Sequence, residues 1–157
     1  MESNKTLIAY ETKGGATEEV AQKIAETLRT KFQLEVDLVD LKRQKPPSLD
    51  GYRNIVVGSG IRVGKAYDKV LKFLENHFAD KRVAFYVCCG DGADSEKCEG
   101  AKVKYIENVL ANYPEVKAVS TAAFGGRMKV LGRTVYDYLD LSKAEGWAEE
   151  LGKKFSA

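Results

Sequence analysis

The hydrophobic and polar positions along the chain follow two patterns that take turns. Short apolar runs of strand length recur from the N-terminus into the last third of the chain. These runs are Lys5–Tyr10, Glu35–Leu41, Asn54–Gly58, Arg82–Cys89 and Val116–Phe124. Three of them lack a polar face, which is typical of strands that are buried on both sides. The pattern therefore predicts five strands in one sheet.

Between these runs, apolar residues recur with helical spacing. The segments with this spacing are a stretch from Thr17 onward, Tyr67–Phe78, Lys102–Leu110 and a last stretch from Ser142 onward. Ser142 and Glu145 form an S-x-x-E pattern, which indicates a capping box at the start of the last helix. The segment Arg127–Asp140 is ambiguous, because its apolar residues could line a helix face but Gly132 interrupts them.

The alternation of strands and helices predicts the fold class. Parallel strands that are joined through helices give a mostly parallel sheet with helices on both faces and right-handed crossovers. Five strands in 157 residues suit a doubly wound α/β fold with strand order 2-1-3-4-5. Neither an internal repeat nor a low-complexity linker interrupts the chain, so we expect residues 1–157 to form a single domain.

The composition narrows the classes of function. Apolar residues make up 44% of the chain and charged residues 31%, with a net charge of +2, which is ordinary for a globular protein. No apolar run is long enough for a transmembrane helix, and the start of the chain lacks a signal-peptide core, so we expect a cytoplasmic protein without an integral membrane segment. No basic run with interleaved aromatic residues suggests a nucleic-acid partner. Cys88, Cys89 and Cys98 are expected to be free thiols, and with His77 they make a poor metal-binding set.

The candidate ligand site lies where the strand order reverses, beyond the carboxyl ends of the strands. The first loop at this point contains two glycines and two threonines at the start of a helix whose first N–H groups have no internal partner. These donors and the helix dipole favour an anion, and the small residues suit a single phosphate group. A plain strand-to-helix turn that Thr17 caps is the alternative. The candidate phosphate-binding residues are Thr12, Lys13, Gly14, Gly15, Ala16 and Thr17.

Two further loops reach the same predicted edge of the sheet. The loops after the third and fourth strands are rich in glycine, with Ile61, Val63 and the stem of Arg62 as apolar cover. Either loop alone could be an ordinary surface turn, but three small-residue loops around one point indicate a planar ring that carries donors and acceptors. The candidate ring-binding residues are Ser59, Gly60, Ile61, Arg62, Val63, Gly64, Cys89, Gly90, Asp91 and Gly92. None of the loops supplies a dinucleotide fingerprint or a complete Walker A motif.

These loops resemble those of flavodoxins. Glu11–Thr17 (ETKGGAT) is similar to the [ST]-x-T-G-x-[TA] loop that holds the phosphate of FMN, and Cys89-Gly90-Asp91 matches the C-G-D sequence that is frequent in the family. Gly58–Lys65 and the late Phe124–Arg127 (FGGR) resemble the branch with menaquinone-dependent protoporphyrinogen dehydrogenases. The resemblance covers the full chain, implies a flavodoxin-like fold with FMN as the cofactor, and adds Arg127 to the candidate cofactor-binding residues.

The resemblance implies an electron carrier. Such a protein shuttles low-potential single electrons between redox partner proteins through the neutral semiquinone/hydroquinone couple of FMN, and it needs no catalytic residue of its own. The chain departs from the family in two ways. Its rim is expected to be basic, so acidic ferredoxin-like or iron–sulfur proteins are the expected partners. It also has no aromatic residue near the expected ring position before Tyr67. The alternative is FMN-dependent oxidation of protoporphyrinogen by a quinone, in which Arg127, Lys129 and Arg133 would bind propionates. A flavin-free binding module is the third interpretation.

Overall fold

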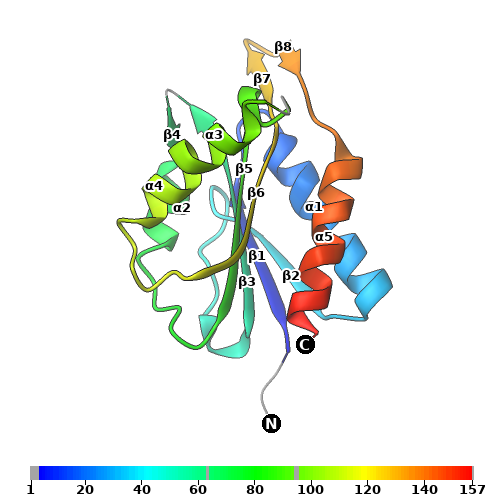
Figure 1. Cartoon of the computed structure of the whole chain (residues 1–157), viewed down its shortest axis with the longest axis vertical. Coiled ribbons are helices and arrows are strands. Elements are labelled where there is room, and N and C mark those ends of the chain that lie inside the picture. The colour runs from blue at the N-terminus through cyan, green and yellow to red at the C-terminus, as the bar shows by residue number, and fades with distance from the viewer. Residues whose placement is uncertain (1–3, 63, 94–95, 157) are drawn as a thin grey trace.

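The computed structural model describes residues 4–62, 64–93 and 96–156. Its central sheet contains five parallel strands in the order β2-β1-β3-β5-β6 (Figure 1). These strands are β1 (Thr6–Glu11), β2 (Val36–Asp40), β3 (Asn54–Arg62), β5 (Arg82–Cys89) and β6 (Ala118–Gly125). When only the parallel strands are counted along the chain, this is the predicted order 2-1-3-4-5. The doubly wound α/β fold is therefore confirmed.

Helices cover both faces of the sheet, as expected (Figure 1). One face carries α1 (Ala16–Phe32) and α5 (Leu141–Phe155), and the other carries α2 (Asp68–Phe73), α3 (Cys98–Lys102), the π-helical turn η3 (Val103–Glu107) and α4 (Asn108–Leu110). Because successive strand residues point to opposite sides, Ile8 and Tyr86 are buried under α1 and α5, while Leu7 and Phe85 are buried in the second core. Within the described ranges, no helix combines the length and the apolar character needed to cross a bilayer.

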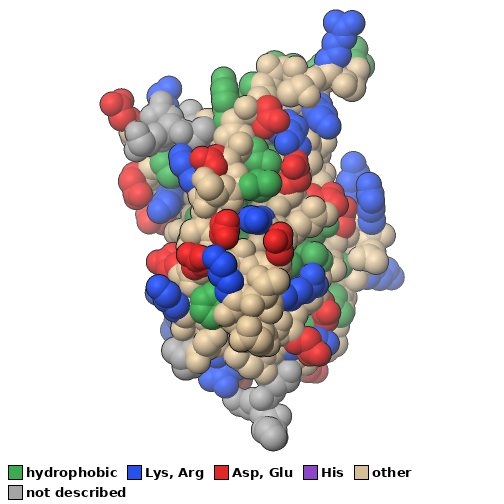
Figure 2. All heavy atoms as spheres, turned by 90° about the vertical axis from the view of Figure 1, so that its right-hand side faces the viewer, with side chains coloured by type: hydrophobic (Ala, Val, Ile, Leu, Met, Phe, Trp, Pro, Cys, Tyr) green, Lys and Arg blue, Asp and Glu red, His purple; other side chains and the backbone are tan. Residues whose placement is uncertain are grey.

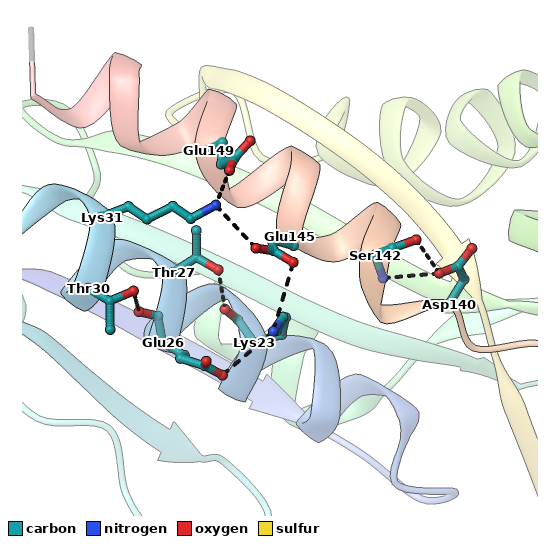
Figure 3. Close-up of polar contacts among 9 residues, drawn as sticks. All are labelled: Lys23, Glu26, Thr27, Thr30, Lys31, Asp140, Ser142, Glu145 and Glu149. Atoms are coloured by element: carbon teal, nitrogen blue, oxygen red, sulfur yellow. Dashed lines mark hydrogen bonds and ion pairs between the residues drawn. The ribbon is translucent and has the colours of Figure 1, made fainter.

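The pair α1 and α5 forms one outer surface of the molecule, where acidic and basic side chains are interspersed (Figure 2). Beneath this surface the helices approach closely at Gly152, where any Cβ atom would overlap the ring of Phe32. Above it, Lys31 binds Glu149 and lies 3.2 Å from Glu145, while Lys23 lies 3.9 Å from Glu145 (Figure 3). These ion pairs are partly exposed, so the buried contact contributes most of the stability of the helix pair.

The start of α5 differs from the prediction. The side chain of Asp140 accepts a hydrogen bond of 3.0 Å from the backbone N–H of Ser142, so Asp140 is the N-cap residue (Figure 3). Glu145 reaches toward the lysines of α1 instead of the helix start. The predicted capping box of Ser142 and Glu145 is therefore wrong, because an equally good cap lies two residues earlier and the glutamate has cationic partners.

The ambiguous segment after the fifth parallel strand forms a β-hairpin. Its strands are β7 (Arg127–Val130) and β8 (Arg133–Asp137), and the hairpin projects beyond the end of the sheet (Figure 1). The two-residue loop has φ of 50° at Leu131 and 78° at Gly132. Positive φ at both positions is the geometry of a type I′ hairpin turn. The helical interpretation of this segment is therefore wrong.

Two other elements differ in length from their sequence patterns. β3 continues to Arg62 and then folds back, so that β4 (Lys65–Ala66) pairs with it in the antiparallel sense. The helix expected over Tyr67–Phe78 ends at Phe73, where the side-chain amide of Asn76 donates a hydrogen bond of 2.8 Å to the last carbonyl. Phe78 is buried nonetheless.

Candidate functional site

The loop after β1 places a helix N-terminus at the point where the strand order reverses. Gly15 is the N-cap residue of α1 and has φ of 94°, a left-handed conformation that an L side chain rarely adopts. The hydroxyl of Thr12 accepts a hydrogen bond of 2.9 Å from the N–H of Gly15 and so closes the turn. A hydroxyl that accepts from an N–H still has its own proton to donate. The turn therefore presents a helix start and a hydroxyl donor to the same space.

Arg127, the first residue of β7, lies against this loop. A Cβ atom on Gly14 would overlap the carbonyl oxygen of Arg127, and one on Gly15 would lie 3.2 Å from its guanidinium. The guanidinium binds Glu19 and donates a hydrogen bond of 3.0 Å to Asp137. The hydrogen bond to Glu19, followed by that to Asp137, raises the pKa of Arg127, and the same guanidinium lowers the pKa of Asp137. The cation beside the loop is thus held in place by two carboxylates.

The end of β3 brings Tyr67 over the same region. The buried hydroxyl of Ser59 accepts a hydrogen bond of 2.9 Å from the N–H of Tyr67 and donates one of 2.7 Å to the carbonyl of Gly60. Gly60 is required here, because a Cβ atom would lie 2.6 Å from the hydroxyl of Tyr67. Lys13 lies 4.5 Å from the centre of the Tyr67 ring, in cation–π contact. Burial raises the pKa of Tyr67.

A cavity of about 440 Å³ opens between this tyrosine and the hairpin. It is lined by Lys13, Gly14, Ile61, Arg62, Tyr67, Arg127, Met128, Lys129 and Tyr136. A second cavity, of about 20 Å³, adjoins the first, and Lys13, Gly14, Ile61, Tyr67, Arg127 and Tyr136 line both. The further lining residues of the second cavity are Thr12, Ala16, Thr17, Gly60, Cys88 and Gly126, so it lies at the start of α1. We call the first cavity the broad end of the candidate site and the second its narrow end.

The structure brings together many of the predicted site residues. Those that line one or both of the two cavities are Thr12, Lys13, Gly14, Ala16, Thr17, Gly60, Ile61, Arg62 and Arg127. Gly15 acts through the backbone turn and Ser59 through its hydrogen bonds. Gly64, with φ of 74°, lies in the exposed β3–β4 turn. Val63 lies outside the described residues.

The loop after β5 contributes differently from the expectation. Gly90, Asp91 and Gly92 belong to a 3₁₀ turn, η2 (Gly90–Ala93), and a Cβ atom on Gly92 would overlap the carbonyl of Phe124. The carbonyl of Cys89 accepts a hydrogen bond of 2.9 Å from Gly126. The described lining of the cavity includes Cys88 rather than Cys89, Gly90 or Gly92.

Two tyrosines that line the cavity were not predicted as site residues from the sequence. Tyr67 was expected only as the first aromatic residue after the third-strand loop, and Tyr136 was not expected at the site. Tyr136 reaches the cavity because it pairs with Met128 across the hairpin. Its ring stacks on that of Tyr138, with centroids 4.9 Å apart. The sequence signal for it is weak, since it depends on recognising the hairpin.

Another cavity, of about 450 Å³, lies between the end of β2 and α2. Leu41, Gln44, Lys45, Pro46, Lys69, Lys72, Phe73, Glu75 and Asn76 line it. None of the three small-residue loops contributes to this lining, so the cavity near Tyr67 is the better candidate site. Among the residues that the structure describes, no group of three His, Cys, Asp or Glu side chains is placed to hold a metal ion.

The fold and the position of this cavity define a doubly wound protein with a cavity at the topological switch point, where proteins of this architecture bind ligands. Residues 7–140 match the family model described as flavodoxin domain, so the chain belongs to the flavodoxin domain family. Oxidised flavodoxin 2 from Bacillus cereus superposes with a TM-score of 0.64 at 25% identity, covering 96% of this chain and 99% of that one. Oxidised flavodoxin 1 from the same organism has a TM-score of 0.65 at 17% identity, with 95% and 97% covered.

A curated relative matches over a shorter stretch. It is protoporphyrinogen IX dehydrogenase [quinone] from Escherichia coli (strain K12), which is 30% identical over 73 residues. The aligned stretch covers 46% of this chain and 40% of that protein. The match therefore agrees with the family, and it spans less than half of the relative.

Proposed function

We propose that the protein binds FMN and, in the cytoplasm, carries single electrons at low potential between redox partner proteins. The observation that carries this proposal is the adjacency of two cavities with shared lining residues, a broad one lined by two tyrosines and a small one at the start of α1. A tricyclic ring and a phosphate on a ribityl chain have the same division into a broad flat part and a small anionic end. Membership of the flavodoxin domain family supports the same cofactor.

The narrow end fits a phosphate group by the chemistry of its donors. The first N–H groups of α1 lack intrahelical partners, and the helix dipole favours an anion there. The hydroxyl of Thr12 and the guanidinium of Arg127 lie at the same place. The hydroxyl of Thr17 is engaged differently, because it is buried and hydrogen-bonded to the thiol of Cys88. We assign the phosphate contacts mainly to the loop N–H groups, Thr12 and Arg127.

The broad end fits a planar ring by size and by lining. Its volume of about 440 Å³ is within the range of small-molecule sites, roughly 300–1,000 Å³. Tyr67 and Tyr136 offer aromatic faces, while the backbone around Gly60 and Ile61 offers donors and acceptors. FMN supplies the redox chemistry when bound, and the protein supplies binding, orientation and electrostatics.

The partners that suit this site are acidic iron–sulfur or ferredoxin-like proteins. Arg62 and Lys129 line the larger cavity and are exposed. An acidic protein approaching this side would be attracted by these charges. The shorter match to the dehydrogenase does not favour porphyrinogen oxidation over this role, and an anaerobic assay of protoporphyrinogen with a quinone separates the two functions.

Calorimetry with FMN and riboflavin tests the proposed cofactor. We expect FMN to bind at least about tenfold more tightly than riboflavin, because charge-assisted hydrogen bonds to a phosphate contribute roughly 1.5–3 kcal/mol each. Thr12→Val should weaken FMN binding by roughly 10- to 100-fold and leave riboflavin binding nearly unchanged. Absence of heat with FMN, or equal affinity for both flavins, would contradict the proposal.

A matched pair of glycine substitutions tests the place of binding. Gly14→Ala puts a Cβ atom where the carbonyl of Arg127 lies, so the loop and β7 must separate. We expect this change to weaken FMN binding by about tenfold or more. The control is Gly51→Ala, since nothing lies within 4 Å of a Cβ atom at Gly51. Equal affinities of the two variants would move the site elsewhere.

A further inference from the structure

The β7–β8 hairpin and the segment that follows it concentrate exposed apolar side chains. Among the described residues, seven large hydrophobic side chains are exposed, and five of these lie between residues 130 and 141. Val130, Leu131 and Val135 belong to the hairpin, and Tyr138 and Leu141 follow it. Leu131 is 100% exposed and stands at the outermost turn. An apolar group of this kind at a projecting point marks an interaction surface more often than a scattered surface leucine does.

The backbone conformation at position 131 disfavours a leucine, so folding alone does not explain this residue. Its φ of 50° is left-handed, and this conformation suits Asn, Asp or Gly at the first position of a type I′ turn. A leucine there is strained in the backbone and gains nothing from burial. Because the residue is disfavoured both by its conformation and by its exposure, its side chain is better explained by a contact outside the chain.

The hairpin also carries a one-sided charge. Residues 128–136 (MKVLGRTVY) contain Lys129 and Arg133 but no acidic residue. Both cations are exposed, and Arg133 pairs across the strands with Val130 at the tip. In Figure 2, basic and hydrophobic side chains stand together at the projecting top of the molecule. The surface therefore matches an apolar socket with an acidic rim.

The base of the same hairpin lines the larger cavity of the candidate site. Met128, Lys129 and Tyr136 contribute to that lining, and the tip lies only a few residues further along both strands. A partner that seats the tip is thereby brought beside the mouth of the cavity. The base is held firmly, since Arg127 binds Glu19 of α1 and lies 3.0 Å from Asp137 of β8. The hairpin can thus position a partner relative to the site.

We infer that the tip of the hairpin, Val130–Val135, is the docking element for an acidic electron-transfer protein, with Leu131 inserted into an apolar socket of that protein. This inference rests on the proposed function as an electron carrier. A membrane surface is less favoured, because the tip Val130–Val135 contains no aromatic side chain, and its one cation and three large aliphatic side chains make a weak interfacial anchor. In the docked complex, one electron leaves the reduced flavin and reduces the iron–sulfur cluster of the partner.

The test measures electron transfer from the FMN-loaded, dithionite-reduced protein to an acidic [2Fe–2S] ferredoxin by stopped-flow absorbance, after excess dithionite has been removed. Leu131→Asn is the informative variant, because Asn suits the left-handed turn and keeps the hairpin. We expect it to lower the second-order rate constant at least fivefold, while FMN affinity and the midpoint of thermal unfolding are kept or raised. The control is Val119→Thr, which changes a half-exposed side chain on β6, and it should leave the rate unchanged.

The charged part of the inference has its own pair of variants. Arg133→Gln should lower the rate constant about threefold at low salt and flatten its dependence on ionic strength, whereas Lys153→Gln at the far end of α5 should do neither. FMN binding is measured first for every variant, so a protein that binds no FMN refutes the proposed function and not the docking surface. In an FMN-loaded protein, a rate that Leu131→Asn leaves unchanged, or transfer without salt dependence, overturns the inference. Binding of the wild type to anionic vesicles that Leu131→Asn abolishes would assign the tip to a membrane instead and would also overturn it.

Discussion

The buried thiol of Cys88 gives a sharp test of the packing beneath the site. Cys88 lies near the end of β5, is 4% exposed and packs in the core under α1 and α5. Burial, opposed by a hydrogen bond from Thr17, raises the pKa of the thiol to about 12. An exposed thiol in an unfolded chain ionises near pH 8.5–9. The folded protein therefore holds Cys88 protonated across a pH range in which the unfolded chain releases the proton.

The sign and size of the effect follow from this difference. When folding raises the pKa of an acid, the protonated group contributes its full share of the free energy of unfolding below the unfolded pKa. This contribution is lost as the pH rises toward the folded pKa. A pH of about 10.5 is roughly 1.5 units above the pKa of the unfolded thiol. At 1.36 kcal/mol per unit, the wild type loses about 2 kcal/mol of its free energy of unfolding. Cys88→Ala should cost about 1 kcal/mol near pH 7 through lost burial. Near pH 10.5 the variant should instead be about 1 kcal/mol more stable than the wild type.

Urea unfolding of the cofactor-free protein at both pH values, with reductant present, measures these free energies. The control is Val87→Ala, because Val87 is fully buried on the same strand and has no titrating group. Its cost should be the same at both pH values. If the difference in the free energy of unfolding between wild type and Cys88→Ala changes by less than about 0.5 kcal/mol between the two pH values, burial does not keep the thiol protonated at the higher pH.

Three further substitutions address the core and the rim. Tyr86→Phe removes the hydrogen bond of 2.8 Å that the buried hydroxyl donates to the carbonyl of Thr17, so the free energy of unfolding should fall by about 1 kcal/mol; an unchanged urea midpoint would contradict this role. Arg62→Ala should lower the more negative flavin potential by about 20–30 mV in a spectroscopic redox titration. The shift is small because water and salt screen the interaction of an exposed cation with the ring. Arg127→Ala should shift this potential at least as much, because it removes a less exposed positive charge and leaves the carboxylates of Glu19 and Asp137 uncompensated; an unchanged potential in this variant would contradict the place of Arg127 beside the ring.

The parallel strands could be predicted from the sequence because burial on both faces leaves a continuous apolar run. The end of β3 could not, since Ser59-Gly60-Ile61-Arg62 carries no such run. That part is extended because it pairs with β5 as far as Gly60 and then with β4 at Ile61 and Arg62. This part is a strand because of its pairing with segments that are distant in the sequence. The local pattern of apolar residues carries no information about such pairing.

The β7–β8 hairpin could not be predicted from the sequence for a different reason. The spacing of Val130, Leu131 and Val135 is compatible with a helix, and only Gly132 argues against one. The decisive feature is the positive φ of Leu131, which the residue type itself disfavours. Local preference and structure conflict here, and such conflicts tend to fall at functional positions. The sequence could predict the turn at Gly132 but not the hairpin around it.

In the candidate site, the glycine and hydroxyl residues of the first loop were accessible to sequence reasoning because two glycines and two threonines stand together at a predicted helix start, where free N–H groups favour an anion. The aromatic walls were not, because Tyr67 depends on the Ser59 hydroxyl and Tyr136 on pairing with Met128. Both contacts join segments whose approach only the fold determines. The donor set at the narrow end therefore follows from the chain, and the shape of the broad end follows from tertiary structure.

The close contacts at the glycines join the candidate phosphate loop and the hairpin into one unit. Gly14 packs on the carbonyl of Arg127, and Gly125 packs on that of Tyr138, so both ends of the hairpin segment press on the mouth of the sheet. The guanidinium of Arg127 adds a bond to Glu19 in the first turn of α1. We therefore expect the loop and the base of the hairpin to move together, because neither backbone has room to move past the other. A ligand in the cavity and a partner at the tip should then influence each other through this shared packing.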